Sequence, residues 1–268
     1  MKVLITRQIP DAGIRLLRKH PELEIDYRQG PPLSKEELKE AIKDVEAIIP
    51  VIPDKIDEEI IEAGKNLKLI ATYSVGYDHI DLEAAEKRNI YVSNTPGDLT
   101  ESVAEHAVAL MLAVGKNIVQ SDKFVRTQKY NFWDPMLFLG PKFMGKTLGI
   151  VGFGKIGQHV ADIARDGFNM RIVYSDIVKH INKGAEFLSL DELLGTSDIV
   201  SINCTLNEKT HHLIDESELR KMKPTAILIN TSRGPVINEK TLIRALQEKW
   251  IEGAGLDVFE QEPEVPQE

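Results

Sequence analysis

The sequence predicts an α/β protein with two doubly wound parallel-sheet domains. Three observations support this prediction. Short apolar runs alternate with amphipathic stretches along all 268 residues, a glycine-rich turn lies between an apolar run and a helical pattern, and the breaker Pro96-Gly97 interrupts the series. A β-α-β-α alternation implies parallel strands with helices on both faces, and this length can supply two cores. We therefore expect domains at 1–97 and 98–268.

The first domain is predicted to contain five strands. They are expected at Val3–Thr6, Glu24–Tyr27, Ala47–Val51, Leu69–Tyr73 and Ile90–Ser93. Helical patterns separate them, for instance at Asp11–Lys19 and Ser34–Lys43. Ser34 followed by Glu37 is a capping-box signature, in which each residue's side chain accepts from the other's backbone N–H.

The second domain is predicted to open with one long helix from about Thr100 to Phe124. Its apolar side chains recur at helical spacing: Val103, Ala107, Leu110, Met111 and Val114. Loop-like sequence follows from Tyr130 to Pro141. The remaining strands are expected at Leu148–Val151, Arg171–Tyr174, Asp198–Asn203, Ala226–Asn230 and Gly253–Val258.

Composition excludes several classes of protein. The single cysteine, Cys204, allows no disulfide framework and no thiolate metal site, and it is expected to be a small buried filler. The formal net charge of −9 and the lack of a basic cluster argue against nucleic-acid binding. The longest apolar run, near Ala107 to Val114, is too short to span a bilayer. We expect a cytoplasmic protein without a metal, in which an acidic ligand would need a local cation.

The glycine-rich turn predicts a dinucleotide site. It follows the apolar run Leu148–Val151, precedes an amphipathic helix, and reads Gly152-Phe153-Gly154-Lys155-Ile156-Gly157. Gly152 permits the tight turn, Gly154 lets the backbone approach a pyrophosphate, and Gly157 lets the helix approach the strand. The helix N-terminus then offers N–H groups to the phosphates. The alternative is a structural turn without a ligand.

An acidic residue near the end of the next strand indicates which dinucleotide binds. Asp176 lies 19 positions after Gly157, where a carboxylate accepts hydrogen bonds from ribose hydroxyls and repels a 2′-phosphate. NAD is therefore favoured over NADP. Lys179 and His180 weaken this preference, because basic groups there could help to hold a phosphate.

From Tyr73 onward the chain resembles the D-isomer-specific 2-hydroxyacid dehydrogenases. The motifs that carry the resemblance are Ser74-Val75-Gly76-Tyr77-Asp78-His79-Ile80-Asp81, Asn94-Thr95-Pro96, Val103-Ala104-Glu105-His106, the glycine turn, Ile229-Asn230-Thr231-Ser232-Arg233-Gly234 and Gly255-Leu256-Asp257-Val258-Phe259-Glu260-Gln261-Glu262-Pro263. The resemblance implies a flavodoxin-like substrate domain, normally completed by a C-terminal segment, a Rossmann NAD-binding domain, and an active site in the cleft between them.

The resemblance also implies roles for individual residues. Arg233 matches the arginine that binds the substrate's carboxylate and keto oxygen, a task suited to a guanidinium fork. Glu262 matches the carboxylate that orients the catalytic histidine and raises its pKa. Asp257 matches the residue that hydrogen-bonds the nicotinamide carboxamide. Each role has an alternative. Arg233 could be a surface arginine in a turn, and Glu262 could belong to a solvated acidic loop that also holds Glu260 and Glu264. Asp257 could be a turn residue that ends a strand.

Other positions are assigned to the two ligands in the same way. The N–H groups of Val75 and Gly76 would hold the substrate carboxylate, and Ile52 would border the pocket, although an isoleucine is as easily core. Thr205 and Thr231 would contact the cofactor, with ordinary loop hydrogen bonding as the alternative.

The segment 133–140, Trp133-Asp134-Pro135-Met136-Leu137-Phe138-Leu139-Gly140, resembles the loop of glyoxylate and hydroxypyruvate reductases. Exposed aromatic side chains in such a loop commonly pack against another subunit, so the sequence predicts a homodimer. The alternative is a tryptophan that covers the core of its own domain.

The family's proton donor is a histidine in a Pro-His pair that follows the Glu262 region. This sequence ends at Glu268, and its seven histidines, His20, His79, His106, His159, His180, His211 and His212, lack that context. Either the sequence is part of a longer enzyme or the protein has lost its general acid; the intact motifs favour the first explanation. All seven, His106 among them, are expected to be structural, and only His79, which follows the carboxylate-binding loop, could lie near the substrate.

We therefore expect an NAD-dependent reductase of small 2-oxo acids, with glyoxylate or hydroxypyruvate as the leading substrate. One alternative is a non-catalytic NAD(H)-binding regulatory protein on the same scaffold. The other is a D-lactate or phosphoglycerate type of dehydrogenase.

Overall fold

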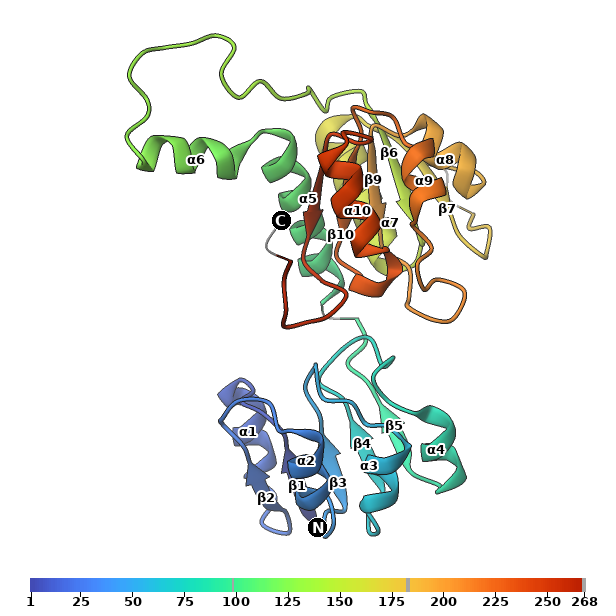
Figure 1. Cartoon of the computed structure of the whole chain (residues 1–268). Helices are drawn as coiled ribbons and strands as arrows, with labels where there is room; N and C mark the ends of the chain where they lie inside the picture. Colours follow the sequence, from blue (N-terminus) through green and yellow to red (C-terminus); the bar gives the residue numbers. More distant parts are fainter. Residues whose placement is uncertain (98, 182–183, 267–268) are drawn as a thin grey trace. The chain divides into compact units, whose positions relative to one another are not determined.

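The computed structural model describes residues 1–97, 99–181 and 184–266. The chain forms two compact units, Met1–Leu99 and Thr100–Glu268 (Figure 1). Each unit contains one sheet in which every strand pair is parallel, so the predicted α/β class with two parallel sheets is confirmed. The predicted boundary falls at Asp98, which lies outside the described residues.

The first unit has a five-stranded sheet of order β2-β1-β3-β4-β5. Its strands are β1 (Lys2–Ile5), β2 (Glu24–Tyr27), β3 (Ala47–Ile49), β4 (Leu69–Ala71) and β5 (Tyr91–Ser93). Its helices are α1 (Asp11–Leu17), α2 (Lys35–Ala41), α3 (Glu58–Ala63) and α4 (Leu82–Lys87). The order reverses between β1 and β3, as in flavodoxin-like sheets, and ligands bind at such switch points.

Side chains alternate between the two faces of this sheet, so each face has its own core. Ile14 of α1 packs against Val3 and Ile5 on one face. The helices α2, α3 and α4 cover the other face, where Leu4 and Ile48 lie. At the start of α2 the predicted capping box is confirmed, because Ser34 and Glu37 satisfy each other's backbone N–H groups.

A buried ion pair fixes the turn that follows β3. Asp54, 5% exposed, accepts a hydrogen bond from Arg7 Nη2 at 2.9 Å and another from the Val51 N–H at 3.2 Å. Arg7 Nη2 also donates to the Val51 carbonyl at 3.3 Å. Because Arg7 follows β1, the pair ties together the carboxyl ends of the two strands at the switch point.

The second unit has a six-stranded sheet of order β11-β10-β9-β6-β7-β8. Its strands are β6 (Thr147–Val151), β7 (Arg171–Ser175), β8 (Ala185–Phe187), β9 (Ile199–Ile202), β10 (Ile227–Asn230) and β11 (Gly253–Leu256). Its helices are α5 (Thr100–Gly115), α6 (Ile118–Arg126), α7 (Lys155–Phe168), α8 (Leu190–Thr196), α9 (Glu216–Lys221) and α10 (Glu239–Gln247), with a 3-10 turn at Gly234–Val236. Counted from β6 as the first strand, this is the Rossmann order, with its switch point between β6 and β9.

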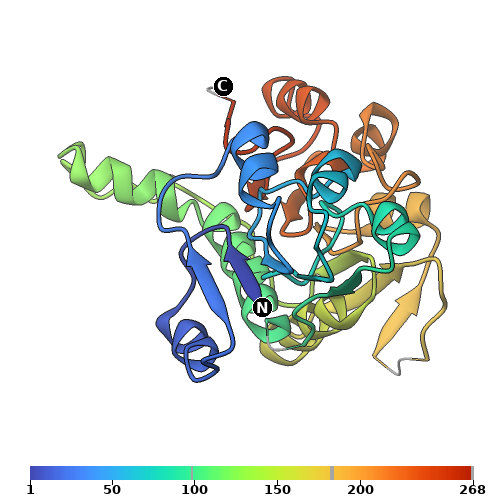
Figure 2. The ribbon, with the colours of Figure 1, turned by 90° about the horizontal axis from the view of Figure 1, so that it is seen from below.

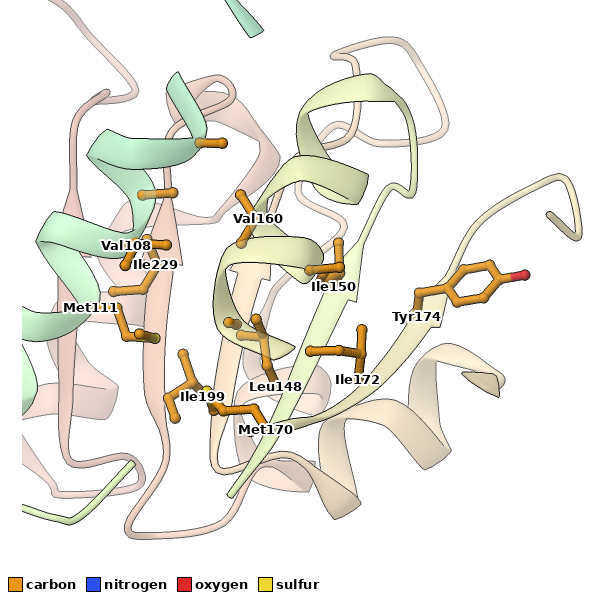
Figure 3. Close-up of a cluster of buried hydrophobic side chains, with 14 of the residues drawn as sticks. Val108, Met111, Leu148, Ile150, Val160, Met170, Ile172, Tyr174, Ile199 and Ile229 are labelled. Atoms are coloured by element: carbon orange, nitrogen blue, oxygen red, sulfur yellow. The ribbon is translucent and has the colours of Figure 1, made fainter. Parts of the chain in front are cut away.

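Two cores enclose this sheet. Helices α5 and α7 pack on one face, where Val108 and Met111 of α5 approach Ile229 of β10 (Figure 3). Helices α8, α9 and α10 cover the other face through side chains such as Leu193, Leu219 and Leu242. Both faces of this parallel sheet are therefore buried, which explains why its strands are short, continuous apolar runs in the sequence.

The prediction of one helix from Thr100 to Phe124 is wrong. The helix ends at Gly115, and α6 begins after Asn117, whose φ of 53° is left-handed. The two helices are bent by 59° relative to each other. Two residues account for the break. Gly115 accepts a close contact that a larger residue would not, and Asn117 accepts a left-handed conformation that does not occur inside a helix. The short strand β8 was also not predicted, because its alternating, half-polar sequence resembles a loop.

Residues 118–140, here called the arm, begin with α6, which contains no buried residue. Figures 1 and 2 both show α6 extending away from the sheet of the second unit. Most of its large apolar side chains are exposed: Ile118, Val119, Val125, Tyr130, Phe132, Trp133, Met136 and Leu139. Among the described residues no single helix is long and apolar enough to cross a membrane, although the bent pair α5 and α6 passes that test together by length and composition.

The Arg7–Asp54 pair leads to a stability prediction. Asp54→Ala leaves the partly buried Arg7 guanidinium without its charged partner, so we expect the free energy of unfolding of the first unit to fall by about 2–3 kcal/mol. Hydrogen exchange followed by mass spectrometry should show lost protection in peptides from β1 and β3. Peptides from the second unit and the exposed-site variant Asp44→Ala provide controls. Unchanged protection in Asp54→Ala would show that the pair contributes little.

Candidate cofactor and active site

The glycine turn connects β6 to α7 by close backbone contacts. Gly152 has φ +90°, and a Cβ on it would lie 2.5 Å from the backbone N of Cys204. A Cβ on Gly157 would lie 2.4 Å from the Gly152 carbonyl oxygen. Both positions therefore require glycine, the first for its left-handed conformation and the second for the close approach of helix and strand.

Gly154 differs from its two neighbours, because a Cβ on it would meet no described atom within 4 Å. It is the N-cap of α7 and has no side chain with which to cap the helix. The N–H groups of the first helical turn are therefore left for a ligand, and the helix dipole favours an anion there. Open space and free donors at this position fit a pyrophosphate.

Asp176, just after β7, is held by the same turn. Its Oδ2 accepts from the Phe153 N–H at 2.6 Å, and its Oδ1 accepts from the Val178 N–H at 3.1 Å. Each carboxylate oxygen has two lone pairs, so one acceptor site remains on each oxygen. That pair of sites matches two neighbouring ribose hydroxyls, as the prediction for Asp176 requires.

The side chain of Phe153 points into the core. It is fully buried and stacks on Tyr174 with ring centroids 4.1 Å apart. Tyr174 Oη accepts from the His180 N–H and donates to the His180 carbonyl, both at 2.9 Å. His180 is thereby placed with Nε2 3.6 Å from Asp176 Oδ2. Phe153 thus contributes its backbone to the turn and its ring to the packing beneath it.

Polar atoms without partners gather beside the turn. Among the described residues, Thr231 Oγ1 and Asn203 Oδ1 are buried without a hydrogen-bond partner. They follow β10 and β9, next to the switch point of the sheet. Buried polar atoms without partners are costly, so these two atoms fit contacts with a bound cofactor. Thr205 is exposed, and its carbonyl accepts from Thr210 Oγ1 at 2.7 Å.

The loop that carries Arg233 is shaped by a buried asparagine. Asn230 Nδ2 donates to the Arg233 carbonyl at 3.0 Å, and Asn230 Oδ1 accepts from the Ser232 N–H at 3.0 Å. The Arg233 side chain donates from Nη1 to the Ser232 carbonyl at 2.8 Å. A Cβ on Gly234 would lie 1.9 Å from the Phe259 carbonyl oxygen, so this loop touches the loop that carries Glu262.

Reciprocal hydrogen bonds anchor the Glu262 loop. Glu260 Oε2 accepts from the Glu239 N–H and Glu239 Oε2 accepts from the Glu260 N–H, both at 3.1 Å. His212 Nε2 lies 2.8 Å from Glu260 Oε1. Although partial burial acts to raise it, the His212 and Glu239 contacts lower the pKa of Glu260 below its usual value. Glu262 itself is exposed and accepts from the Phe259 N–H at 2.9 Å.

In the first unit, the segment after β4 forms a loop stabilised by its own side chains. Ser74 Oγ donates to the Gly76 carbonyl at 2.6 Å, and Asn94 Nδ2 donates to the Val75 carbonyl at 2.8 Å. Within the part of the chain that the structure describes, the N–H groups of Val75 and Gly76 are not engaged in a hydrogen bond. They are thus available for an anion. Thr72 Oγ1 lies 3.0 Å from His79 Nε2.

Ile52 lies in the turn after β3 and is partly exposed. It therefore is not a core residue of the first unit. Cys204 is half-buried, and desolvation raises the pKa of its thiol to about 11, so the thiol remains protonated at neutral pH. Across residues 1–97, 99–181 and 184–266, no three His, Cys, Asp or Glu side chains are grouped to hold a metal ion.

Several site residues were not predicted from the sequence. Asn230 and His212 shape the loops around Arg233 and Glu262, and the buried Oδ1 of Asn203 lies beside the cofactor turn. A polar residue at the end of a buried strand, as Asn230 is in β10, or directly after one, as Asn203 is after β9, was a usable signal for both asparagines. No local signal marks His212, because its partner Glu260 is 48 positions away.

The chain matches known proteins in both sequence and structure. Residues 108–268 match the model of the D-isomer specific 2-hydroxyacid dehydrogenase NAD binding domain. The glyoxylate reductase of Korarchaeum cryptofilum is 47% identical over 99% of this chain and 81% of its own length. A crystal structure of a Thermus thermophilus protein matches with a TM-score of 0.94 and 42% identity, covering 100% of this chain and 85% of that one. The D-lactate dehydrogenase of Aquifex aeolicus, complexed with NAD and lactic acid, matches with a TM-score of 0.86 and 34% identity, covering 97% and 78%.

The glycine turn yields a paired prediction. Gly157→Ala places a Cβ against the Gly152 carbonyl, so we expect a clear fall in the melting temperature. Gly154→Ala meets no protein atom, so the melting temperature should stay within a degree or two while the dissociation constant for NADH rises about tenfold or more. Differential scanning fluorimetry and NADH fluorescence titration measure the two quantities. Equal effects of the two variants on both quantities would contradict this assignment.

Proposed function

The chain belongs to the D-isomer-specific 2-hydroxyacid dehydrogenase family, and on that premise we propose that it reduces small 2-oxo acids with NADH, glyoxylate or hydroxypyruvate first among them. The observation that carries the proposal is the position of Arg233. It follows β10, whose neighbour β9 ends beside the glycine turn. A cation at the carboxyl end of the sheet supplies what an acidic substrate needs in a protein with a net charge of −9.

NADH, when bound, supplies the hydride for the keto carbon, and a proton must reach the keto oxygen to complete the 2-hydroxy acid. Arg233 holds the substrate carboxylate and polarises the keto oxygen, which carries growing negative charge during the reaction. The N–H groups of Val75 and Gly76 bind the substrate carboxylate. Ile52 borders the same pocket and excludes water from the apolar side of the substrate. Glu262 would orient the histidine of the Pro-His pair that the family places after this region, and would keep that imidazole protonated so that it can donate the proton to the keto oxygen.

The cofactor contacts follow the same logic. The first turn of α7, with Gly154, Lys155 and Ile156, binds the pyrophosphate, and Asp176 accepts from the ribose hydroxyls. Thr231 uses its buried hydroxyl, which has no other described partner, and Thr205 contributes from the neighbouring strand end. Asp257 accepts a hydrogen bond from the carboxamide of the nicotinamide.

The exposed arm supports the further proposal that the protein forms a homodimer. Trp133 is 75% exposed in the single chain, so it does not cover the core of its own unit. A second copy that covers the arm would bury this apolar surface, and patches of this kind mark interfaces. We also place the protein in the cytoplasm, supported by its single cysteine, which leaves no disulfide within the chain.

A substrate panel tests the proposed reaction. Protein expressed from its complete reading frame should oxidise NADH, followed at 340 nm, with glyoxylate and hydroxypyruvate faster than with pyruvate or a phosphorylated 2-oxo acid. A preference for pyruvate would indicate the D-lactate type of enzyme. NADH binding without turnover of any acid would favour a regulatory NAD(H)-binding protein and contradict the proposal.

The role of Arg233 is tested in the same assay. Arg233→Ala removes the fork that holds the carboxylate, so we expect the KM for glyoxylate to rise and kcat to fall, with kcat/KM at least about a hundredfold lower. Arg233→Lys should recover only part of the loss, because lysine cannot bind a carboxylate bidentately. Unchanged kinetics in Arg233→Ala would remove Arg233 from the site.

The homodimer is tested by sedimentation velocity. The double variant Phe132→Ser and Trp133→Ser should sediment as a monomer where the unaltered protein sediments as a dimer, since it removes two exposed aromatic side chains from the arm. Tyr91→Ser, which removes an exposed aromatic of the first unit, is the control and should remain dimeric. A monomeric unaltered protein would refute the dimer.

A further inference from the structure

Helix α5 and strand β11 are packed in a regular series of contacts. A Cβ on Gly253 would lie 2.9 Å from Val114 Cγ1, and one on Gly255 would lie 3.2 Å from Leu110 Cβ. The absence of both side chains therefore lets the helix lie close to the strand. The next pair in the series is His106 and Asp257, with Nε2 3.1 Å from Oδ1.

The spacing shows why this third pair forms. Each step of two residues along the strand is matched by a step of four residues back along the helix. Two strand residues rise about 6.6 Å and four helical residues about 6 Å, so the two elements keep in register. The contact between His106 and Asp257 is thus set by the packing of α5 on β11, and it falls at the carboxyl end of the sheet.

The location of this pair indicates a role beyond folding. Both side chains are 49% exposed, and an ion pair or hydrogen bond this open to water contributes little to stability. The contact instead limits the rotation of the Asp257 carboxylate. It occupies one lone pair of Oδ1 and leaves Oδ2 for another donor. Asp257 follows β11 directly, so its free oxygen lies at the edge where ligands of such sheets bind.

We propose that His106 is a positioning residue for the nicotinamide end of the cofactor, acting through Asp257. The imidazole holds the carboxylate in the orientation that accepts the carboxamide N–H. Preorganising an acceptor in this way lowers the ordering cost of binding. The inference rests on the role proposed above for Asp257, and it extends that role to a residue of α5 that the sequence had indicated to be structural.

A comparison of two ligands tests this proposal. NADH carries the nicotinamide, whereas ADP-ribose shares only the adenosine, pyrophosphate and second ribose. His106→Leu should raise the dissociation constant for NADH about five- to tenfold, the effect of losing one ordinary hydrogen bond at an exposed position. The dissociation constant for ADP-ribose should stay within about twofold. Isothermal titration calorimetry measures both without any turnover.

Two further variants complete the experiment. His106→Gln places an amide donor where Nε2 stands, so it should restore NADH binding to within about twofold of the unaltered protein. His20→Leu breaks another exposed histidine–carboxylate contact, the one to Glu22 at 3.1 Å in the first unit, and should change neither constant.

Each other outcome overturns the inference in a recognisable way. Equal losses for both ligands in His106→Leu would mean that His106 supports the fold of the unit. A glutamine variant that binds as poorly as the leucine variant would mean that the hydrogen bond is not the cause. Failure of the unaltered protein to bind NADH would instead refute the proposed function itself.

Discussion

The close approach of the Gly152 turn to the backbone of Cys204 is the constraint on which the cofactor site depends. Strands β6 and β9 are neighbours in the sheet but lie far apart in the sequence, and their ends meet only because Gly152 has no side chain. The same turn directs the Phe153 N–H to Asp176 and the free first turn of α7 toward open space. A single position without a Cβ therefore sets the relative geometry of the first turn of α7 and the Asp176 carboxylate.

Around this site the loops support one another rather than standing alone. Asn230 shapes the Arg233 loop, the contact at Gly234 joins that loop to the one that carries Glu262, and Glu260 ties the latter to α10 and His212. The loops that carry Arg233 and Glu262 are thus held by side chains of β10 and α10 and by the His212–Glu260 contact. Sites built on such supports keep their geometry better than sites on free loops.

The sequence predicted the two parallel sheets and the glycine turn between β6 and α7 well, because each is a local signal with a fixed spacing. The helix break at Asn117 was missed, since apolar periodicity continues across it while the backbone turns left-handed. The contacts of His212 with Glu260 and of His106 with Asp257 could not be predicted, because they join residues 48 and 151 positions apart. Such pairs follow from the packing of elements and not from any short pattern.

The exposure of helix α6 determines how its helical structure can be stabilised. Nine residues are fewer than an isolated helix needs in water, and α6 contains no buried residue. An outside surface that covers α6 would therefore stabilise its helical structure. If a second copy supplies that surface, folding of the arm and association become one equilibrium, governed by mass action, and the local structure of α6 becomes a function of protein concentration.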